Sequence, residues 1–173
     1  MENKIDFLWV NRIIPQRKVN WVLKYFAEEN SQRLVILGDK NKEPFVRDFI
    51  KSRNLKHISI LGYLAPIPYY QKSRFFLLPA DVVFANNALL EAMSYGVVPL
   101  VSDVSGSDLI VDHLQSGYIF PHDYQGFKEA IEWAIKLDKA SYDKLSQNAR
   151  LKVEKDFSFE KFKAGYKKMI DSI

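Results

Sequence analysis

Short, uninterrupted apolar runs, separated by segments with helical periodicity, limit the possible folds of this chain more than any other feature. The six runs are bounded by Gly, Pro, Asp or Asn and cover residues 7–10, 34–37, 58–61, 75–78, 97–101 and 118–120. Strands that are apolar throughout are buried on both faces, as in a parallel sheet covered by helices. Between them, apolar residues recur at helical spacing, as in Trp21, Val22, Tyr25 and Phe26. The pattern predicts an α/β domain with a doubly wound parallel sheet of about six strands.

The segment after Phe120 has no convincing strand pattern and is expected to be helical. We expect helices over 124–137, 141–155 and 159–173, with Asp123 and Ser158 as N-caps. The chain is then one domain over 1–173, with an α/β core at about 1–138 and C-terminal helices at 139–173. The last helix has an apolar stripe (Phe159, Phe162, Tyr166, Met169, Ile170 and Ile173) opposite Lys161, Lys163, Lys167 and Lys168. We expect this stripe to pack into the core; the alternative is an amphipathic surface for another domain or a membrane interface.

Length and composition exclude several classes of protein. The 173 residues suit one domain of ordinary size and are too few for two full enzyme domains. The absence of cysteine excludes a disulfide framework, a thiolate zinc site and a cysteine nucleophile. The apolar run after the first residues is too short for the apolar region of a signal peptide, and no later run approaches the ~20 apolar residues that cross a bilayer. We expect a soluble, cytoplasmic chain.

The net charge of +4 is unevenly distributed along the sequence. Residues 11–56 carry 11 basic and 5 acidic groups, residues 57–138 carry 4 and 9, and residues 139–173 carry 9 and 5. No stretch is a dense Lys/Arg tract with interleaved aromatic residues, which argues against a nucleic-acid-binding α/β domain. The basic first third can face a small phosphate, or it can simply be solvated.

The first candidate site follows the first predicted strand, where a loop with Arg12, Arg17 and Lys18 leads into a helix. Doubly wound folds bind ligands at such strand ends, because N–H groups of helix N-termini point there. Guanidinium and ammonium groups are donors suited to a diphosphate. The alternative is a solvated basic loop. Neither a GxGxxG nor a Walker A pattern is present, which counts against a dinucleotide dehydrogenase and a P-loop ATPase.

Two further loops contain candidate functional residues. Residues 77–99 lead from a strand through a polar loop to a helix in which Glu91 interrupts an apolar stretch, either as a solvated residue or as an acceptor for ligand hydroxyls. Gly96 is expected at the C′ position of this helix. Residues 102–108 form a small polar loop whose N–H groups can bind an anion or cap the next helix.

Taken together, these stretches resemble the carboxy-terminal domain of the retaining GT-B glycosyltransferases of family 4, often called glycosyl transferases group 1. The pieces that match the family's motifs, in the family's order, are residues 11–18, 37–39, 61–64, 78–80, 90–99, 103–106 and 116–120. The most specific piece is 90–99, with the sequence LEAMSYGVVP. The resemblance implies the Rossmann-like half of a GT-B fold and a nucleotide-sugar donor.

The resemblance also implies roles for individual residues. Arg12 and Arg17, with Lys18 beside them, would hold the diphosphate and stabilise the leaving nucleotide electrostatically. Glu91, as the second glutamate of the family's ExxxxxxxE motif, would accept hydrogen bonds from the ribose hydroxyls.

Two stretches of backbone would complete this binding site. Gly62, Tyr63 and Leu64 would lie along the base. The N–H groups of Asn86, Asn87, Ala88 and Leu89 would face the diphosphate and the sugar.

The chain departs from the family's pattern in the half of the site that holds the sugar. Counting back from Glu91 places the first motif glutamate at Val83, which offers no acceptor for sugar hydroxyls. The nearest carboxylate, Asp81, comes two residues early, and Phe84 and Asn86 replace the expected glycines. The departure leaves open a catalytically degenerate nucleotide-binding or structural domain of the same fold.

The function that the resemblance implies is transfer of a sugar, with retention, from a nucleotide-sugar to a glycan or lipid-linked acceptor. The partners are a nucleotide-sugar or nucleoside diphosphate and an amino-terminal acceptor domain that is absent here, without which the chain would be inactive. No metal, other cofactor or nucleic acid is expected. Membrane contact would be peripheral, through the full-length enzyme or the last helix.

Overall fold

The six predicted strands are all present and form one parallel sheet. A computed structural model describes residues 5–38, 43–83 and 86–171. Its strands are β1 (Ile5–Asn11), β2 (Leu34–Gly38), β3 (Ile58–Ile60), β4 (Ser73–Leu78), β5 (Val98–Ser102) and β6 (Tyr118–Phe120). The helices are the 3-10 turn η1 (Pro15–Arg17), α1 (Val19–Glu28), α2 (Glu43–Ser52), α3 (Ile67–Tyr70), α4 (Asn87–Ser94), α5 (Ser107–Ile110), α6 (Tyr124–Lys136), α7 (Lys139–Asp156) and α8 (Phe159–Ile170).

The strand order is β3-β2-β1-β4-β5-β6. The chain runs from β1 to β3 toward one edge of the sheet and then from β4 to β6 toward the other, so the switch point lies between the neighbouring strands β1 and β4. Phe7 of β1 pairs with Leu34 of β2 on one side and with Phe75 of β4 on the other. Ligands of open α/β sheets bind at the carboxyl ends of the strands beside such a switch point. The topology therefore places the candidate site beyond the ends of β1 and β4.

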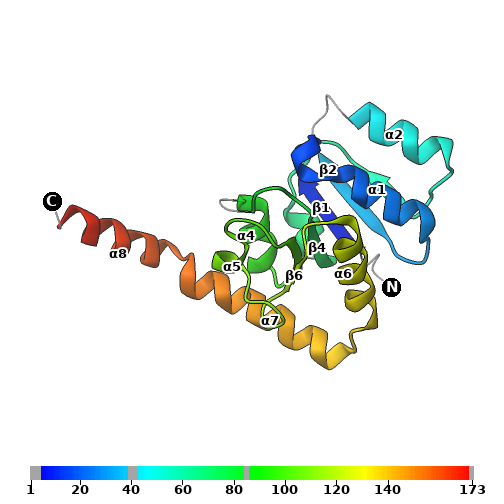
Figure 1. Cartoon of the computed structure of the whole chain (residues 1–173). Coiled ribbons are helices and arrows are strands. Elements are labelled where there is room, and N and C mark those ends of the chain that lie inside the picture. Colours follow the sequence, from blue (N-terminus) through cyan, green and yellow to red (C-terminus); the bar gives the residue numbers. More distant parts are fainter. Residues whose placement is uncertain (1–4, 39–42, 84–85, 172–173) are drawn as a thin grey trace.

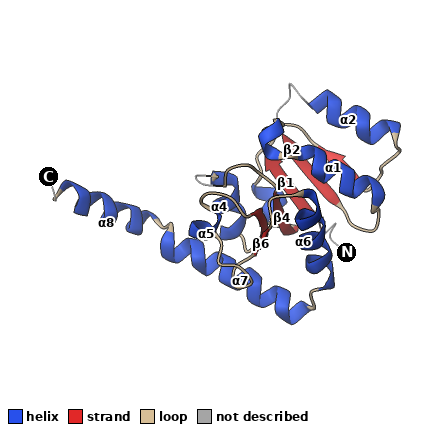
Figure 2. Cartoon of the chain, viewed as in Figure 1, coloured by secondary structure: helices blue, strands red, loops and turns tan. Residues whose placement is uncertain are grey.

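Helices cover both faces of the sheet, which explains the continuous apolar strands (Figures 1 and 2). Side chains of one face, such as Trp9 and Phe75, pack with buried residues of α1, α2 and α6. Side chains of the other face, such as Leu8 and Phe76, pack with buried residues of α3, α4, α5 and α7. The prediction of an α/β doubly wound sheet with C-terminal helices is confirmed.

The predicted helix ends also form as expected. A side-chain oxygen of Asp123 accepts a hydrogen bond from the Gly126 N–H at 2.7 Å, and the Ser158 hydroxyl accepts one from the Lys161 N–H at 3.3 Å. After α4, Gly96 has a φ of 74° and its N–H donates to the Met93 carbonyl at 2.8 Å. A left-handed residue at this position ends a helix most easily when it is glycine.

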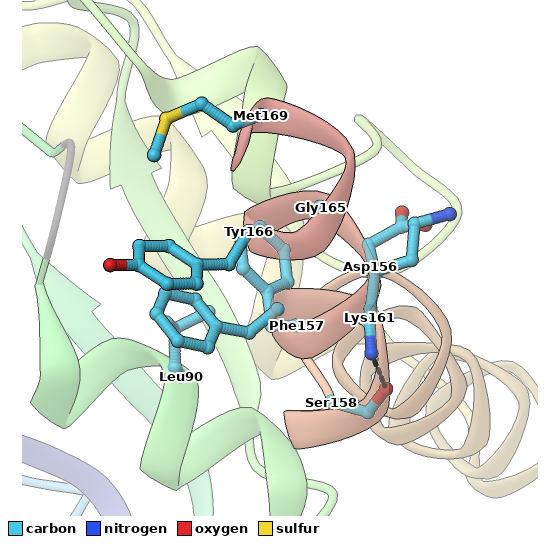
Figure 3. A pocket seen from close by; sticks show the side chains of 9 residues that line it. Leu90, Asp156, Phe157, Ser158, Lys161, Gly165, Tyr166 and Met169 are labelled. Carbon is cyan, nitrogen blue, oxygen red and sulfur yellow. Dashed lines mark hydrogen bonds between the residues drawn. The ribbon is translucent and has the colours of Figure 1, made fainter. Parts of the chain in front are cut away.

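The prediction that the apolar stripe of the last helix packs into the core is wrong. Helix α8 contains no buried residue, and it projects from the body beyond the end of α7 (Figure 1). Phe159 and Phe162 are 72% and 70% exposed. Figure 3 shows Tyr166 and Met169 of α8 directed to the same side as Phe157 and Leu90, with which they border a hollow of about 480 Å³. The helical period correctly identifies an amphipathic helix, but the described residues of its apolar face stay more than half exposed.

A glycine beside β6 allows a stability test of the sheet. A Cβ atom on Gly117 would lie 2.5 Å from Pro99 Cγ and 2.6 Å from the Pro99 carbonyl oxygen. Since the proline ring and its backbone cannot move away easily, Gly117→Ala is expected to lower the free energy of unfolding by about 1–3 kcal/mol. Gly165→Ala in α8 is the control, because its Cβ would meet nothing within 4 Å. Urea unfolding of both variants measures the difference, and equal midpoints would contradict the prediction.

Candidate functional site

An open groove lies at the carboxyl ends of the first three strands and the start of α4. Its volume is about 1300 Å³. The residues that line it come from the ends of β1 and β2, from the segment between β1 and η1, from η1, from the loop after β3, from α3, and from the start and middle of α4. They are Val10, Asn11, Arg12, Arg17, Leu37, Gly38, Gly62, Tyr63, Leu64, Ala65, Pro66, Tyr70, Asn86, Asn87, Ala88 and Glu91. The groove thus has the place in the fold that the topology predicts for a ligand.

Two arginines give this groove a positive wall. Arg12 follows β1 and is exposed, whereas Arg17 is half-buried and donates from Nη1 to the Val82 carbonyl at 2.8 Å. Burial lowers the pKa of Arg17 most, the charge of Arg12 lowers it further, and Asp81 opposes both. Arg12 and Arg17 therefore repel each other in the free protein, and an anion bound between them would relieve that repulsion.

Lys18, the third predicted cation, does not line the groove. Its backbone has a φ of 45°, and its Nζ lies 2.7 Å from Asp81 Oδ1. His122 Nε2 lies 2.9 Å from the same oxygen, and the Asp81 N–H donates to the Gln16 carbonyl at 2.9 Å. The hydrogen bond from Lys18 is the main reason that the pKa of Asp81 lies below its usual value. Asp81 thus ties the segment after β4 to the segment before α1, and its carboxylate is taken up by this contact.

The predicted base-binding loop forms one end of the groove. Gly62 has a φ of 72°, and its carbonyl accepts a hydrogen bond from the Gly38 N–H at 3.1 Å. This bond joins the last residue of β2 to the loop after β3, so the loop is held by the neighbouring strand as well as by its own. Beside it, Tyr63 is 80% exposed and Leu64 is 48% exposed. The structure thus brings all three predicted residues to the groove, with an aromatic ring free to meet a planar group.

The start of α4 forms the opposite part of the groove, although its residues differ in their contribution. Asn86 is the N-cap, and its Oδ1 accepts a hydrogen bond from the Leu89 N–H at 2.9 Å. Asn87 and Ala88 line the groove, and N–H groups in the first turn of a helix lie outside its own ladder of hydrogen bonds. Leu89 is completely buried and does not line the groove. The first turn of α4 is therefore suited to an anion, with Leu89 anchoring it in the core.

Glu91 lies in the groove and has a partner that was not recognised from the sequence. The hydroxyl of Tyr70 donates to Glu91 Oε2 at 3.2 Å. Tyr70 is 1% exposed and its ring stacks on Tyr95, with centroids 5.9 Å apart. Among the described residues that line the groove, Glu91 is the one carboxylate.

The residue that the motif count places at the missing glutamate is in the core. Val83 is completely buried and packs with the side chains between the sheet and α4. Its neighbours Phe84 and Ala85 are outside the described residues. The motif count expects this residue to accept hydrogen bonds from the sugar hydroxyls, but its side chain is in the core and not in the groove.

The polar loop 102–108, the third candidate, has a structural role. Ser107 Oγ accepts a hydrogen bond from the Val104 N–H at 2.9 Å and donates to the Ser102 carbonyl at 2.7 Å. The Ser102 hydroxyl in turn accepts one from the Ala80 N–H at 3.1 Å. These contacts close the loop and begin α5, and no residue of the loop lines the groove.

Among the described residues, no group of three or more His, Asp or Glu side chains is arranged to hold a metal ion. None of the described helices has the combination of length and hydropathy that crossing a membrane requires.

Comparisons with known proteins agree with the fold. The chain is 27% identical to a glycogen synthase of Desulfitobacterium hafniense over 95% of this chain and 38% of that protein. The structure superimposes on sucrose-phosphate synthase from Thermosynechococcus elongatus with a TM-score of 0.84 at 19% identity, covering 99% of this chain and 47% of that one. It superimposes on Anabaena Alr3699/HepE, solved in complex with UDP-glucose, with a TM-score of 0.81 at 17% identity, covering 97% and 49%. The chain therefore spans less than half the length of each of these proteins.

A model of the family described as Glycosyl transferases group 1 matches residues 1–152. This match includes β1 to β6, the groove and most of α7. Since it extends over most of the sequence and the fold agrees, this chain belongs to the glycosyl transferases group 1 family.

Proposed function

We propose that this chain is the donor-binding domain of a retaining GT-B glycosyltransferase of family 4. It would bind the nucleotide-sugar from which a sugar is moved to a glycan or lipid-linked acceptor. The observation that carries the proposal is one groove that holds two mutually repelling guanidiniums, Arg12 and Arg17, together with the Glu91 carboxylate. A nucleoside diphosphate has the complementary groups, because its phosphates are anionic and its ribose offers two hydroxyl donors. The UDP-glucose complex of Anabaena Alr3699/HepE supports the same class of ligand.

The proposal includes a second domain that binds the acceptor. The groove is open to solvent, α8 has no buried residue, and the glycogen synthase relative is more than twice as long as the region matched here. A domain seated over α8 would close the groove from the side of Leu90 and exclude water from the reacting sugar. We therefore expect this chain alone to bind nucleotide and to transfer no sugar. The assembled enzyme would work in the cytoplasm, with peripheral contact to a membrane where its acceptor is lipid-linked.

We also propose that the reaction uses no metal ion. Arg12, Arg17 and the first turn of α4 would supply the positive charge that stabilises the departing diphosphate. Addition of EDTA is then expected to leave nucleotide affinity unchanged. A loss of affinity that Mg²⁺ or Mn²⁺ restores would contradict this part of the proposal.

Isothermal titration calorimetry with UDP, ADP and GDP tests the function directly. At least one diphosphate is expected to bind with one-to-one stoichiometry, and the matching nucleoside, which lacks the phosphates, is expected to bind at least ten-fold more weakly because it cannot contact the arginines. Absence of binding at millimolar concentrations would contradict the proposal. Salt-sensitive binding to RNA or DNA, without nucleotide binding, would instead support a nucleic-acid-binding domain.

Turnover distinguishes an enzyme from a degenerate domain of the same fold. The experiment joins this chain to the amino-terminal domain of its natural protein and measures release of nucleoside diphosphate from nucleotide-sugars. Release that depends on an acceptor supports the transferase. Nucleotide binding without release, across a panel of donors and acceptors, would favour the degenerate domain.

A further inference from the structure

Glu91 is held by a residue on a different helix. Tyr70 ends α3 and Glu91 lies in the middle of α4, and both line the groove. The Tyr70 hydroxyl donates to Oε2 of Glu91 at 3.2 Å. The tyrosine is fixed in turn, because it is 1% exposed, stacks on Tyr95 at 5.9 Å and packs against Phe76 at 6.5 Å between ring centroids. A buried, immobile donor therefore holds the carboxylate of an otherwise exposed side chain.

The chemistry of this pair fixes the direction of the hydrogen bond. Burial, and then the negative charge of Glu91, raise the pKa of Tyr70 well above its usual value. The hydroxyl therefore keeps its proton at neutral pH and donates a hydrogen bond to the carboxylate. An ionised carboxylate accepts about four hydrogen bonds through its two oxygens. With one site taken by Tyr70, Oε1 and the remaining lone pair of Oε2 are left for a ligand that donates from two neighbouring atoms.

We infer that Tyr70 is a positioning residue that orients Glu91 to bind the two adjacent hydroxyls of a ribose. The inference rests on the proposed function and extends it, because it names the residue that sets the orientation of the Glu91 carboxylate. A free glutamate on a helix surface samples several rotamers, and ordering it on binding costs free energy. Tyr70 removes part of this cost in advance. This benefit exists when the ligand has hydroxyls that donate hydrogen bonds to Glu91, and it disappears when the hydroxyls are absent.

Tyr70→Phe tests the inference, since it removes the hydroxyl and keeps the buried ring. Calorimetry measures the affinity of the parent and the variant for UDP and for 2′,3′-dideoxy-UDP, with the ADP or GDP pair taking their place where that diphosphate is the one that binds. The parent is expected to prefer UDP, and Tyr70→Phe is expected to weaken UDP binding about 3- to 10-fold, as for loss of one hydrogen bond to a charged group. The affinity for 2′,3′-dideoxy-UDP is expected to be the same in both proteins. Tyr95→Phe is the matched control, because it removes a hydroxyl from the other ring of the stack, and it should change neither affinity.

The outcomes separate this inference from the function on which it rests. If the parent binds UDP and its dideoxy analogue equally well, or if Tyr70→Phe weakens both equally, the positioning role is overturned while nucleotide binding stands. A smaller effect of Tyr70→Phe in a Glu91→Ala background would support the inference, because the two residues would then act through each other. If the parent binds none of UDP, ADP and GDP, the proposed function itself fails.

Discussion

Val83→Glu is expected to unfold the domain or to lower its free energy of unfolding by at least about 3 kcal/mol. The motif count alone would predict the opposite, namely a restored acceptor and tighter binding of the donor sugar. However, Val83 is completely buried among apolar side chains between the sheet and α4. A carboxylate there would lose its hydration without gaining a partner, and its longer side chain would not fit.

The neighbouring residue is a matched control for this substitution. Val82 is 51% exposed, so Val82→Glu adds the same group to the same loop in contact with water. We expect its midpoint in urea unfolding to stay close to that of the parent, with the change in free energy below about 0.5 kcal/mol. Should Val83→Glu be as stable as the parent and bind nucleotide-sugar more tightly, the loop after β4 would have to rearrange, and the motif count would be right.

Arg17→Ala is expected to weaken binding of the preferred nucleoside diphosphate by about 30- to 1000-fold, or about 2–4 kcal/mol. The half-buried guanidinium is in the groove, and its hydrogen bond to the Val82 carbonyl holds it at the end of the loop. Removing it takes away a fixed, partly desolvated charge at the proposed position of the diphosphate. Isothermal titration calorimetry at constant salt measures the effect.

Two further variants show whether charge or geometry is responsible. Arg17→Lys retains the charge without the planar fork, and it is expected to recover part of the lost affinity. Arg53→Ala removes one positive charge at a distance, since Arg53 follows α2 and lies over the Phe49 ring, 4.1 Å from its centroid. It should change the affinity less than three-fold. An Arg17→Ala effect as small as that of Arg53→Ala would rule out Arg17 as a phosphate-binding residue.

The fold could be predicted from the sequence because its signals are local. Each strand is an apolar run, and caps such as Asp123 and Ser158 depend on residues three positions away. The outward position of α8 could not be predicted, because helical periodicity defines an apolar face and says nothing of what covers it. The family resemblance points to Arg12, Arg17 and Glu91, and the topology brings all three to one groove.

Contacts between distant segments account for the parts of the site that were missed. Tyr70 of α3 reaches Glu91 of α4 through a hydrogen bond between residues 21 positions apart, and no local pattern marks it. Lys18, just before α1, forms an ion pair with Asp81, which follows β4. The orientation of Val83 depends on how the loop leaves β4, whereas the motif count fixes only its place in the sequence. In each case the deciding partner is remote along the chain.

The position of β1 at the centre of the sheet has a consequence for folding kinetics. Phe7 pairs with Phe75, so β1 and β4 come together across the whole first half of the α/β core. Pairing across such a long segment is slow, because the chain loses the conformational entropy of the intervening loop before the stabilising contacts form. The walls of the groove come from both sides of this pairing. A nucleotide can therefore bind only after the slow step, so we expect it to slow unfolding and to leave the rate of folding nearly unchanged.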